Sequence, residues 1–332
     1  MEHQPSGKTD KKPASLSAIL LDIGIRLLPV TLTIFTALCL IYFPYSTDAP
    51  LTTAAQTDLK KYYATAYAKQ GSTVEDENSF YVTNAKKQAD QADIPGYVQK
   101  FVRKYGLENG RVLDVGAGRG YLQDIVSNYV GLDISPSAKR FFHKPFILGS
   151  ATYMPVETDE FDAAWTIWVL EHVPNPEAAL NELRRVVKNE GLIYLLPAWD
   201  CTPYAADGYP VRPYSAYGAS GKLRKAWMPV DTYFWSVSKT LTSTLRHAAW
   251  KVDGGPTRLH YQRLTPNYDQ YWMSDSDAVN SLDRDETARW FVSRGDECLN
   301  CDAGLHAFEH TDDPLILRVH KKPATRQAQQ TH

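Results

Sequence analysis

The sequence lacks the features that mark several large classes of protein. Its 36 lysines and arginines nearly balance 38 aspartates and glutamates, and the net charge of −2 gives no basic surface for nucleic acid. Four cysteines in 332 residues are too few for a disulfide-rich scaffold. Neither an internal repeat nor a low-complexity block occurs. A content of 43% hydrophobic and 22% charged residues is typical of a globular protein with one or two cores.

One long apolar run, from Leu27 to Phe43, carries no charge. As a helix it reaches roughly 25 Å, and an extension back to Ile19 makes it long enough for a ~30 Å hydrocarbon core. Tyr42 and Tyr45 lie where an aromatic belt is expected. A buried core helix and a cleaved signal peptide are the alternatives, but the run has little polar face and no clean cleavage site follows it. We therefore predict a single membrane anchor.

From Arg111 onward, short apolar runs alternate with amphipathic segments, which indicates a parallel sheet covered by helices on both faces. The predicted strands cover residues 111–115, 129–133, 145–148, 161–168 and 192–196, with two more near 297–300 and 315–320. The predicted helices cover residues 51–70, 94–105, 120–128, 137–142, 176–187 and 283–294.

An insert crowded with Tyr, Trp, Pro and Gly follows the fifth predicted strand. Because ligands lie at the carboxyl ends of strands in open α/β sheets, we expect this insert to cap a pocket. Its aromatic residues could hold a flat ligand or form the insert's own small core; they include Tyr204, Tyr209, Tyr214, Tyr217 and Trp227. The predicted organisation is a disordered tail (1–15), a membrane anchor (16–45), a connecting helical segment (46–93), a domain (94–322) containing the insert (198–282), and a second tail (323–332).

The sharpest motif is VLDVGAGRG over residues 112–120, an apolar strand that runs into a glycine-rich turn. Gly116 and Gly118 allow positive φ and a close approach of the backbone to a ligand. The G-x-G-x-G spacing, with Asp114 ahead of it, does not match the usual dinucleotide fingerprint. At the tip of the next strand, Asp133 is placed to accept hydrogen bonds from a ribose, although an acid there could also stabilise a helix N-terminus.

Two further motifs follow in order, FDAAWTIWVLEHVPNP (161–176) and LRRVVKNEG (183–191). Together with VLDVGAGRG and GLDIS (131–135), they resemble class I S-adenosylmethionine (SAM)-dependent methyltransferases of the type 11 branch, which contains ubiquinone and menaquinone biosynthesis enzymes. The resemblance covers roughly residues 95–200. It implies an α/β, Rossmann-like, doubly wound seven-stranded sheet and methyl transfer from SAM, with release of S-adenosylhomocysteine, to a small-molecule, lipid or glycan acceptor. An NAD(P)-dependent oxidoreductase and a non-catalytic SAM-binding module are the alternatives.

The resemblance also implies which residues contact the cofactor. Where the family often has Gly-Asp-Ala after the third strand, this chain has Gly149, Ser150 and Ala151, so the adenine would meet a neutral hydroxyl. The implied cofactor residues are Asp114, Gly116, Gly118, Asp133, Ile134, Ser150, Ala151 and Thr166.

The acceptor side is less defined. Related quinone O-methyltransferases carry Glu-x-x-Glu-His, a set that suits a divalent metal, but here Trp168 occupies the first position, and we therefore expect no metal. His172 could remove a proton from a hydroxyl or amine, and Asp200 is the second catalytic candidate. Structural support of the loop is the alternative for Glu171 and His172. Asp275 and Asp277 are weaker acid/base candidates.

Two features bear on the compartment. Four basic residues precede the apolar run and the next are Lys60 and Lys61, a bias that places the domain outside the cytoplasm. SAM is made in the cytoplasm, so the enzyme interpretation places the domain inside. Cys298 and Cys301 form a single C-x-x-C pair, which we interpret as two ordinary thiols, with a disulfide or a metal clip as the alternatives.

Overall fold

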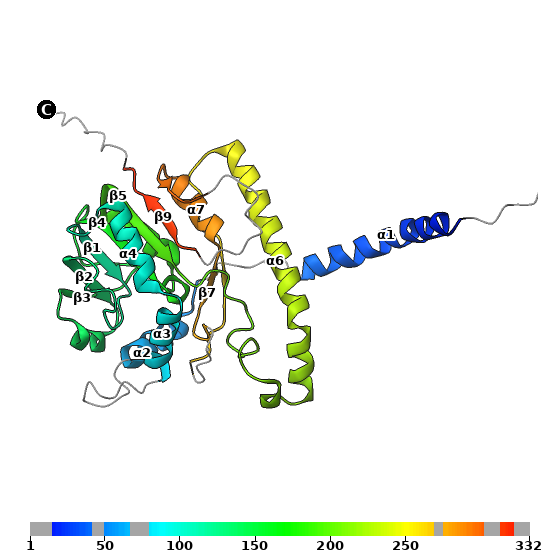
Figure 1. The fold of residues 1–332 in the computed structure, drawn as a ribbon, viewed down its shortest axis with the longest axis horizontal. Helices are drawn as coiled ribbons and strands as arrows, with labels where there is room; N and C mark the ends of the chain where they lie inside the picture. Colours follow the sequence, from blue (N-terminus) through cyan, green and yellow to red (C-terminus); the bar gives the residue numbers. More distant parts are fainter. Residues whose placement is uncertain (1–14, 42–49, 67–79, 269–274, 302–312, 322–332) are drawn as a thin grey trace, which may run out of the picture.

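A computed structural model describes residues 15–41, 50–66, 80–268, 275–301 and 313–321 (Figure 1). Its strands are β1 (Arg111–Val115), β2 (Asn128–Asp133), β3 (Phe146–Leu148), β4 (Phe161–Ile167), β5 (Val187–Leu196), β6 (Tyr261–Arg263), β7 (Asn280–Leu282), β8 (Glu297–Cys298) and β9 (Leu315–Arg318). Seven of them form one sheet in the order β3-β2-β1-β4-β5-β9-β8. The strands from β3 to β5 are parallel, and β9 runs antiparallel to β5. This doubly wound order confirms the predicted fold class.

Helices cover both faces of this sheet. Alternate strand residues point to opposite faces, so Leu113 and Ile193 belong to one buried cluster and Val112 and Trp165 to the other. The first cluster is covered by α5 (Pro176–Val186) and α7 (Arg284–Val292), and the second by α4 (Ile94–Tyr105).

Local sequence explains where these helices begin. At α5 the Asn175 side chain accepts a hydrogen bond from the Ala178 N–H at 3.0 Å. At α7 Asp283 accepts from the Glu286 N–H at 2.9 Å, which is the cap that the Asp-x-x-Glu spacing predicts. Both caps satisfy backbone donors that have no partner within the helix.

The predicted helix over residues 120–128 is wrong. This segment forms successive turns, in which the Gln123 N–H bonds the Gly120 carbonyl and the Ile125 N–H bonds the Leu122 carbonyl. Gly120 has φ +70°, and β2 begins at Asn128, so too few residues remain for a stable α-helix. The neighbouring helix predicted over 137–142 is a short 3-10 helix, Pro136–Phe141. Two shorter 3-10 segments are Leu170–His172 and Tyr214–Ala216.

The insert contains the longest helix of the described chain, α6 (Ala219–Asp253), and the small sheet of β6 and β7. Its two ends lie side by side, because the Asp200 N–H donates to the Leu282 carbonyl at 2.8 Å. Tyr209 stacks on Tyr217 with ring centroids 5.0 Å apart. Tyr209 and Tyr217 are half-buried, whereas Tyr214 and Trp227 are exposed, so an internal core accounts for only part of the insert's aromatic residues.

Three helices precede the sheet domain: α1 (Leu16–Ile41), α2 (Thr53–Ala66) and α3 (Phe80–Gln91). Residues 23–41 of α1 are long and apolar enough to cross a membrane, and none of this stretch is buried. Figure 1 shows α1 extending away from the body on the far side of α6. The end of α1 packs on the middle of α6, where the Phe35 and Phe234 rings are 5.7 Å apart and Ser238 Oγ donates to the Cys39 carbonyl at 2.8 Å.

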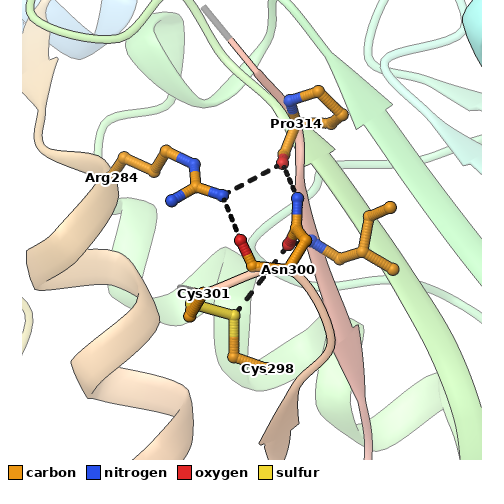
Figure 2. Close-up of a disulfide and its surroundings, with 6 residues drawn as sticks. Arg284, Cys298, Asn300, Cys301 and Pro314 are labelled. Atoms are coloured by element: carbon orange, nitrogen blue, oxygen red, sulfur yellow. Dashed lines mark hydrogen bonds between the residues drawn. A yellow bond between two sulfur atoms is a disulfide. The ribbon is translucent and has the colours of Figure 1, made fainter. Parts of the chain in front are cut away.

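Cys298 and Cys301 are joined by a disulfide, so the expectation of two ordinary thiols is wrong (Figure 2). Side chains fix this turn to the neighbouring strand. Asn300 Nδ2 donates to the Pro314 carbonyl at 2.6 Å, and Asn300 Oδ1 accepts from the Ile316 N–H at 2.9 Å. The Arg284 guanidinium, from α7, donates to the carbonyls of Asn300 and Pro314 (Figure 2).

Candidate active site

A cavity of about 800 Å³ opens at the carboxyl ends of β1, β4 and β5. The glycine loop after β1 forms one wall and the start of α4 another. The insert contributes Asp275. The residues that line the cavity include Asp114, Gly116, Gly118, His172, Tyr194 and Asp275.

The glycine loop needs its glycines for two separate reasons. Gly116 has φ +77°, and a Cβ placed there would lie 2.3 Å from a methyl group of Val169. Gly118 has φ +53°, and its N–H donates to Asp133 Oδ2 at 2.8 Å. Any larger residue at position 116 would therefore collide with Val169 and displace the loop. The carboxylate of Asp133 fixes the same loop through its hydrogen bond with the Gly118 N–H.

The two acids at the ends of β1 and β2 are both buried. Tyr129 Oη donates to Asp114 Oδ2 at 2.7 Å, yet burial raises the pKa of Asp114 to about 7. Burial also raises the pKa of Asp133. Backbone N–H donors, including that of Ser135 at 2.8 Å from Oδ1, oppose this rise but do not cancel it. Asp114 therefore faces the cavity as a carboxyl group that titrates near neutrality.

The other predicted cofactor residues are not among the described residues that line this cavity. Ile134 is exposed, Ser150 Oγ pairs with Thr152 Oγ1 at 2.9 Å, and Thr166 is buried in β4. Ala151 is half-buried beside Ser150. Their roles as cofactor contacts stay predictions.

His172 lies in the cavity wall within a group of carboxylates. Its Nδ1 is 3.8 Å from Asp277 Oδ2 and its Nε2 is 3.7 Å from Glu171 Oε1. Tyr63, from α2, donates its hydroxyl to the same Asp277 oxygen at 2.7 Å. Burial alone would lower the pKa of His172, but the carboxylates of Asp277, Glu171 and Asp275 outweigh it and raise the pKa. The imidazole is therefore made more basic by carboxylates of its own loop and of the insert, and Tyr63 of α2 bonds one of these carboxylates.

Glu171 is fully buried beside His172, and burial raises its pKa to about 7. Neither of its oxygens has a hydrogen-bond partner among the residues that the structure describes. Glu171, His172 and Asp275 each offer one ligand atom within 4.8 Å of the others, a mixed oxygen and nitrogen set that could hold a divalent cation. Asp275, which the insert supplies, is the one member of this set that lies far from Glu171 and His172 in the sequence.

Asp200, the second predicted catalytic residue, requires a correction. It lies outside the lining of this cavity and bonds the ammonium of Lys239, which is also 3.1 Å from Asp283 Oδ2. Nearby carboxylates raise the pKa of Lys239 although burial opposes them. Asp200 thus belongs to an ion-pair cluster that joins α6 to the start of α7, away from His172.

Sequence reasoning missed two tyrosines of this site. Tyr63 was part of an ordinary helical segment with no motif, and Tyr194 was one of several apolar positions in β5. The Tyr194 hydroxyl is buried in the cavity wall without a hydrogen-bond partner in the described part of the chain. No spacing in the sequence distinguishes either residue, because tertiary packing brings Tyr194 to the cavity and Tyr63 to Asp277 and His172.

Comparison with known proteins identifies the segment that builds this site. Residues 113–195 match the family described as "Methyltransferase domain". An uncharacterized methyltransferase of Mycobacterium bovis is 26% identical over 176 residues, which cover 49% of this chain and 68% of that protein. A ubiquinone biosynthesis O-methyltransferase of Dechloromonas aromatica is 33% identical over 106 residues, covering 27% of this chain and 44% of that protein.

The similarity is confined to part of each protein. An uncharacterized protein of Methanocaldococcus jannaschii is 33% identical over 98 residues, and the chain spans only 39% of its length. Among solved structures, a SAM-dependent methyltransferase of Thermotoga maritima is 22% identical with a TM-score of 0.29, covering 34% of this chain and 56% of that one. A sugar N-methyltransferase of Streptoalloteichus is 18% identical with a TM-score of 0.32, covering 39% and 59%. Scores this low carry no information about the site.

Proposed function

Because the chain belongs to the class I SAM-dependent methyltransferase family, we propose that it transfers the methyl group of SAM to a hydroxyl or amine of a small-molecule, lipid or glycan acceptor. The observation that carries this proposal is one shared cavity. The glycine loop that the family uses for the cofactor and the imidazole of His172 both line it.

The cofactor half of the cavity fits the family's ligand. Gly116 lets the loop pass directly over Val169, where a Cβ would collide, and Asp133 fixes the loop through Gly118. Asp114 offers a carboxyl group to the methionine end of the ligand. We expect Asp133, Ile134, Ser150, Ala151 and Thr166 to surround the ribose and adenine.

Bound SAM would supply an activated methyl group on its sulfonium. The bond from sulfur to carbon would break as the acceptor's oxygen or nitrogen bonds the carbon, and the electron pair would stay on sulfur. The protein's task is to align the two reactants, to exclude water and to take up the acceptor's proton. We assign this proton to a ring nitrogen of His172, and Asp277, 3.8 Å from Nδ1, would stabilise the resulting imidazolium.

We further propose that the protein is anchored through α1, with its catalytic domain in the cytoplasm where SAM is made. The apolar stretch over residues 23–41 supports the anchor by length and composition. A membrane location would favour an acceptor that is itself bound to or carried by lipid. Protease protection of a C-terminal tag in intact membranes tests the side on which the domain lies. The proposal expects the tag on the cytoplasmic side, whereas the charge bias around α1 predicts the opposite side.

Titration calorimetry of the full chain tests the cofactor. We expect binding of SAM and S-adenosylhomocysteine, no binding of NAD(P), and loss of affinity in Asp133→Ala because the loop and the ribose lose a shared acceptor. Lys139→Ala, at an exposed position of the 3-10 helix Pro136–Phe141, is the matched control. Tight binding of NAD(P) without S-adenosylhomocysteine would favour an oxidoreductase instead. SAM binding without methyl transfer to any acceptor fraction would favour a non-catalytic module.

A further inference from the structure

The helix α6 presents an apolar stripe that the protein body does not cover. Leu223, Trp227, Leu241, Leu245 and Val252 are between 51% and 85% exposed. Their spacing of three, four and seven residues, continued through positions 234 and 238, places them on one side of a helix. The stripe runs roughly 40 Å along the helix axis.

This stripe is distinct from the face by which α6 joins the protein. The body-facing side contains Trp235, which donates to Gln262, and Thr242, which is buried. A third, polar side carries exposed residues that include Lys222, Thr244 and Lys251. A helix with a separate apolar side next to a polar, basic side is typical of helices that lie in a membrane interface.

The middle of the stripe is where α1 packs. Phe234 and Ser238 occupy stripe positions, and they contact Phe35 and Cys39 near the end of α1. Figure 1 shows α1 leaving α6 on the side opposite the sheet and at a steep angle to it. If α1 crosses a membrane, α6 would therefore lie along the membrane surface, with the apolar stripe facing the lipid.

We propose that α6 lies in the plane of the membrane interface and inserts this stripe, defined by Leu223, Trp227, Leu241, Leu245 and Val252, into the bilayer that α1 spans. The exposed aromatic ring of Trp227 suits the headgroup level, and the lysines on the polar side suit lipid phosphates. The inference rests on α1 being the membrane helix and does not depend on the catalytic proposal. It gives the domain a fixed orientation on the membrane, which a single flexible anchor would not.

Depth-dependent fluorescence quenching tests this inference on the full chain. Leu241→Cys and Leu245→Cys carry an environment-sensitive dye in phosphatidylcholine–phosphatidylglycerol vesicles that contain a spin-labelled acyl chain. Thr244→Cys, on the polar side, is the matched control, and Ile34→Cys reports on α1. All variants share Cys39→Ala and Cys201→Ala, and circular dichroism verifies their folding.

We expect severalfold stronger quenching at positions 241 and 245 than at 244, together with strong quenching at 34. Quenching at 34 with equal, weak quenching at 241, 244 and 245 would overturn the inference while leaving the anchor intact. Weak quenching at all four positions would overturn both. Weak quenching at positions 241 and 245, together with cross-linking between two copies of the chain, would also overturn the inference. A second chain, and not lipid, would then cover the stripe.

Discussion

His172 Nδ1 and Asp277 Oδ2 face each other 3.8 Å apart at the edge of the cavity. The histidine follows the fourth strand, whereas the aspartate ends the insert, and Tyr63 from an N-terminal helix bonds the same oxygen. The main-chain N–H of Val279 also donates to the Glu171 carbonyl at 2.9 Å, which ties the two segments together. The insert therefore supplies side chains to the surroundings of His172 and does more than cover the cavity.

This arrangement predicts separate effects on binding and on chemistry. We expect His172→Gln to lower kcat by about 100-fold or more, since it removes the proton acceptor. Asp277→Asn should lower kcat by roughly tenfold, because the imidazolium loses its partner. Both variants should bind S-adenosylhomocysteine with unchanged affinity and melt at an unchanged temperature. A parallel loss of cofactor binding would assign His172 and Asp277 to structural support instead.

A second prediction concerns the three potential metal ligands Glu171, His172 and Asp275. Because a sulfonium needs no Lewis acid to release its methyl group, we expect EDTA to leave the initial rate unchanged. Asp275→Asn should then alter KM for the acceptor more than it alters kcat. Loss of activity in EDTA, with recovery on addition of Mg²⁺ or Zn²⁺, would contradict the expectation and would make Asp275 a replacement for the ligand lost at Trp168.

A third prediction follows from the pKa of about 7 at Asp114. The folded protein retains this proton at a pH where the unfolded chain has released it, so the free energy of unfolding should fall as the pH rises from about 4 to about 7, by on the order of 1.4 kcal/mol per unit. Above that range the contribution is constant. Asp114→Asn should flatten the dependence and make the ligand-free protein relatively more stable at about pH 8. Urea denaturation at several pH values measures the free energy of unfolding of both proteins. The same pH dependence in the wild type and in Asp114→Asn would contradict the prediction.

A fourth prediction concerns the Cys298–Cys301 disulfide. It closes a very short loop, so its removal should cost only about 2 kcal/mol of stability. Asn300→Ala should cost a comparable amount, because the Ile316 N–H loses a bond of 2.9 Å and the Pro314 carbonyl one of 2.6 Å. Thermal melts of Cys298→Ser/Cys301→Ser and of Asn300→Ala measure both. A wild-type melting temperature that does not change on reduction would show that the bridge contributes nothing.

Local sequence was sufficient for the elements that depend on short-range patterns. The strand Arg111–Val115 and the helix Ile94–Tyr105 have the predicted bounds, because a short apolar run and the glycine at 106 act within a few residues. The glycine loop was also predictable, since positive φ at Gly116 is a property of the residue itself. The segment over 120–128 failed for the opposite reason: its pattern suited a helix, but the sheet left no length for one.

The sequence by itself therefore determined the sheet, the cofactor loop and the apolar N-terminal helix. Tertiary structure decided which acids serve the site: Asp275 and Asp277 reach His172, while Asp200 bonds Lys239. These acids are alike in sequence, and only the path of the insert separates them. The same holds for the stripe on α6, whose apolar spacing could have faced the core. Its exposure depends on which side of the helix the body and α1 occupy, and that is set by packing between segments far apart in the chain.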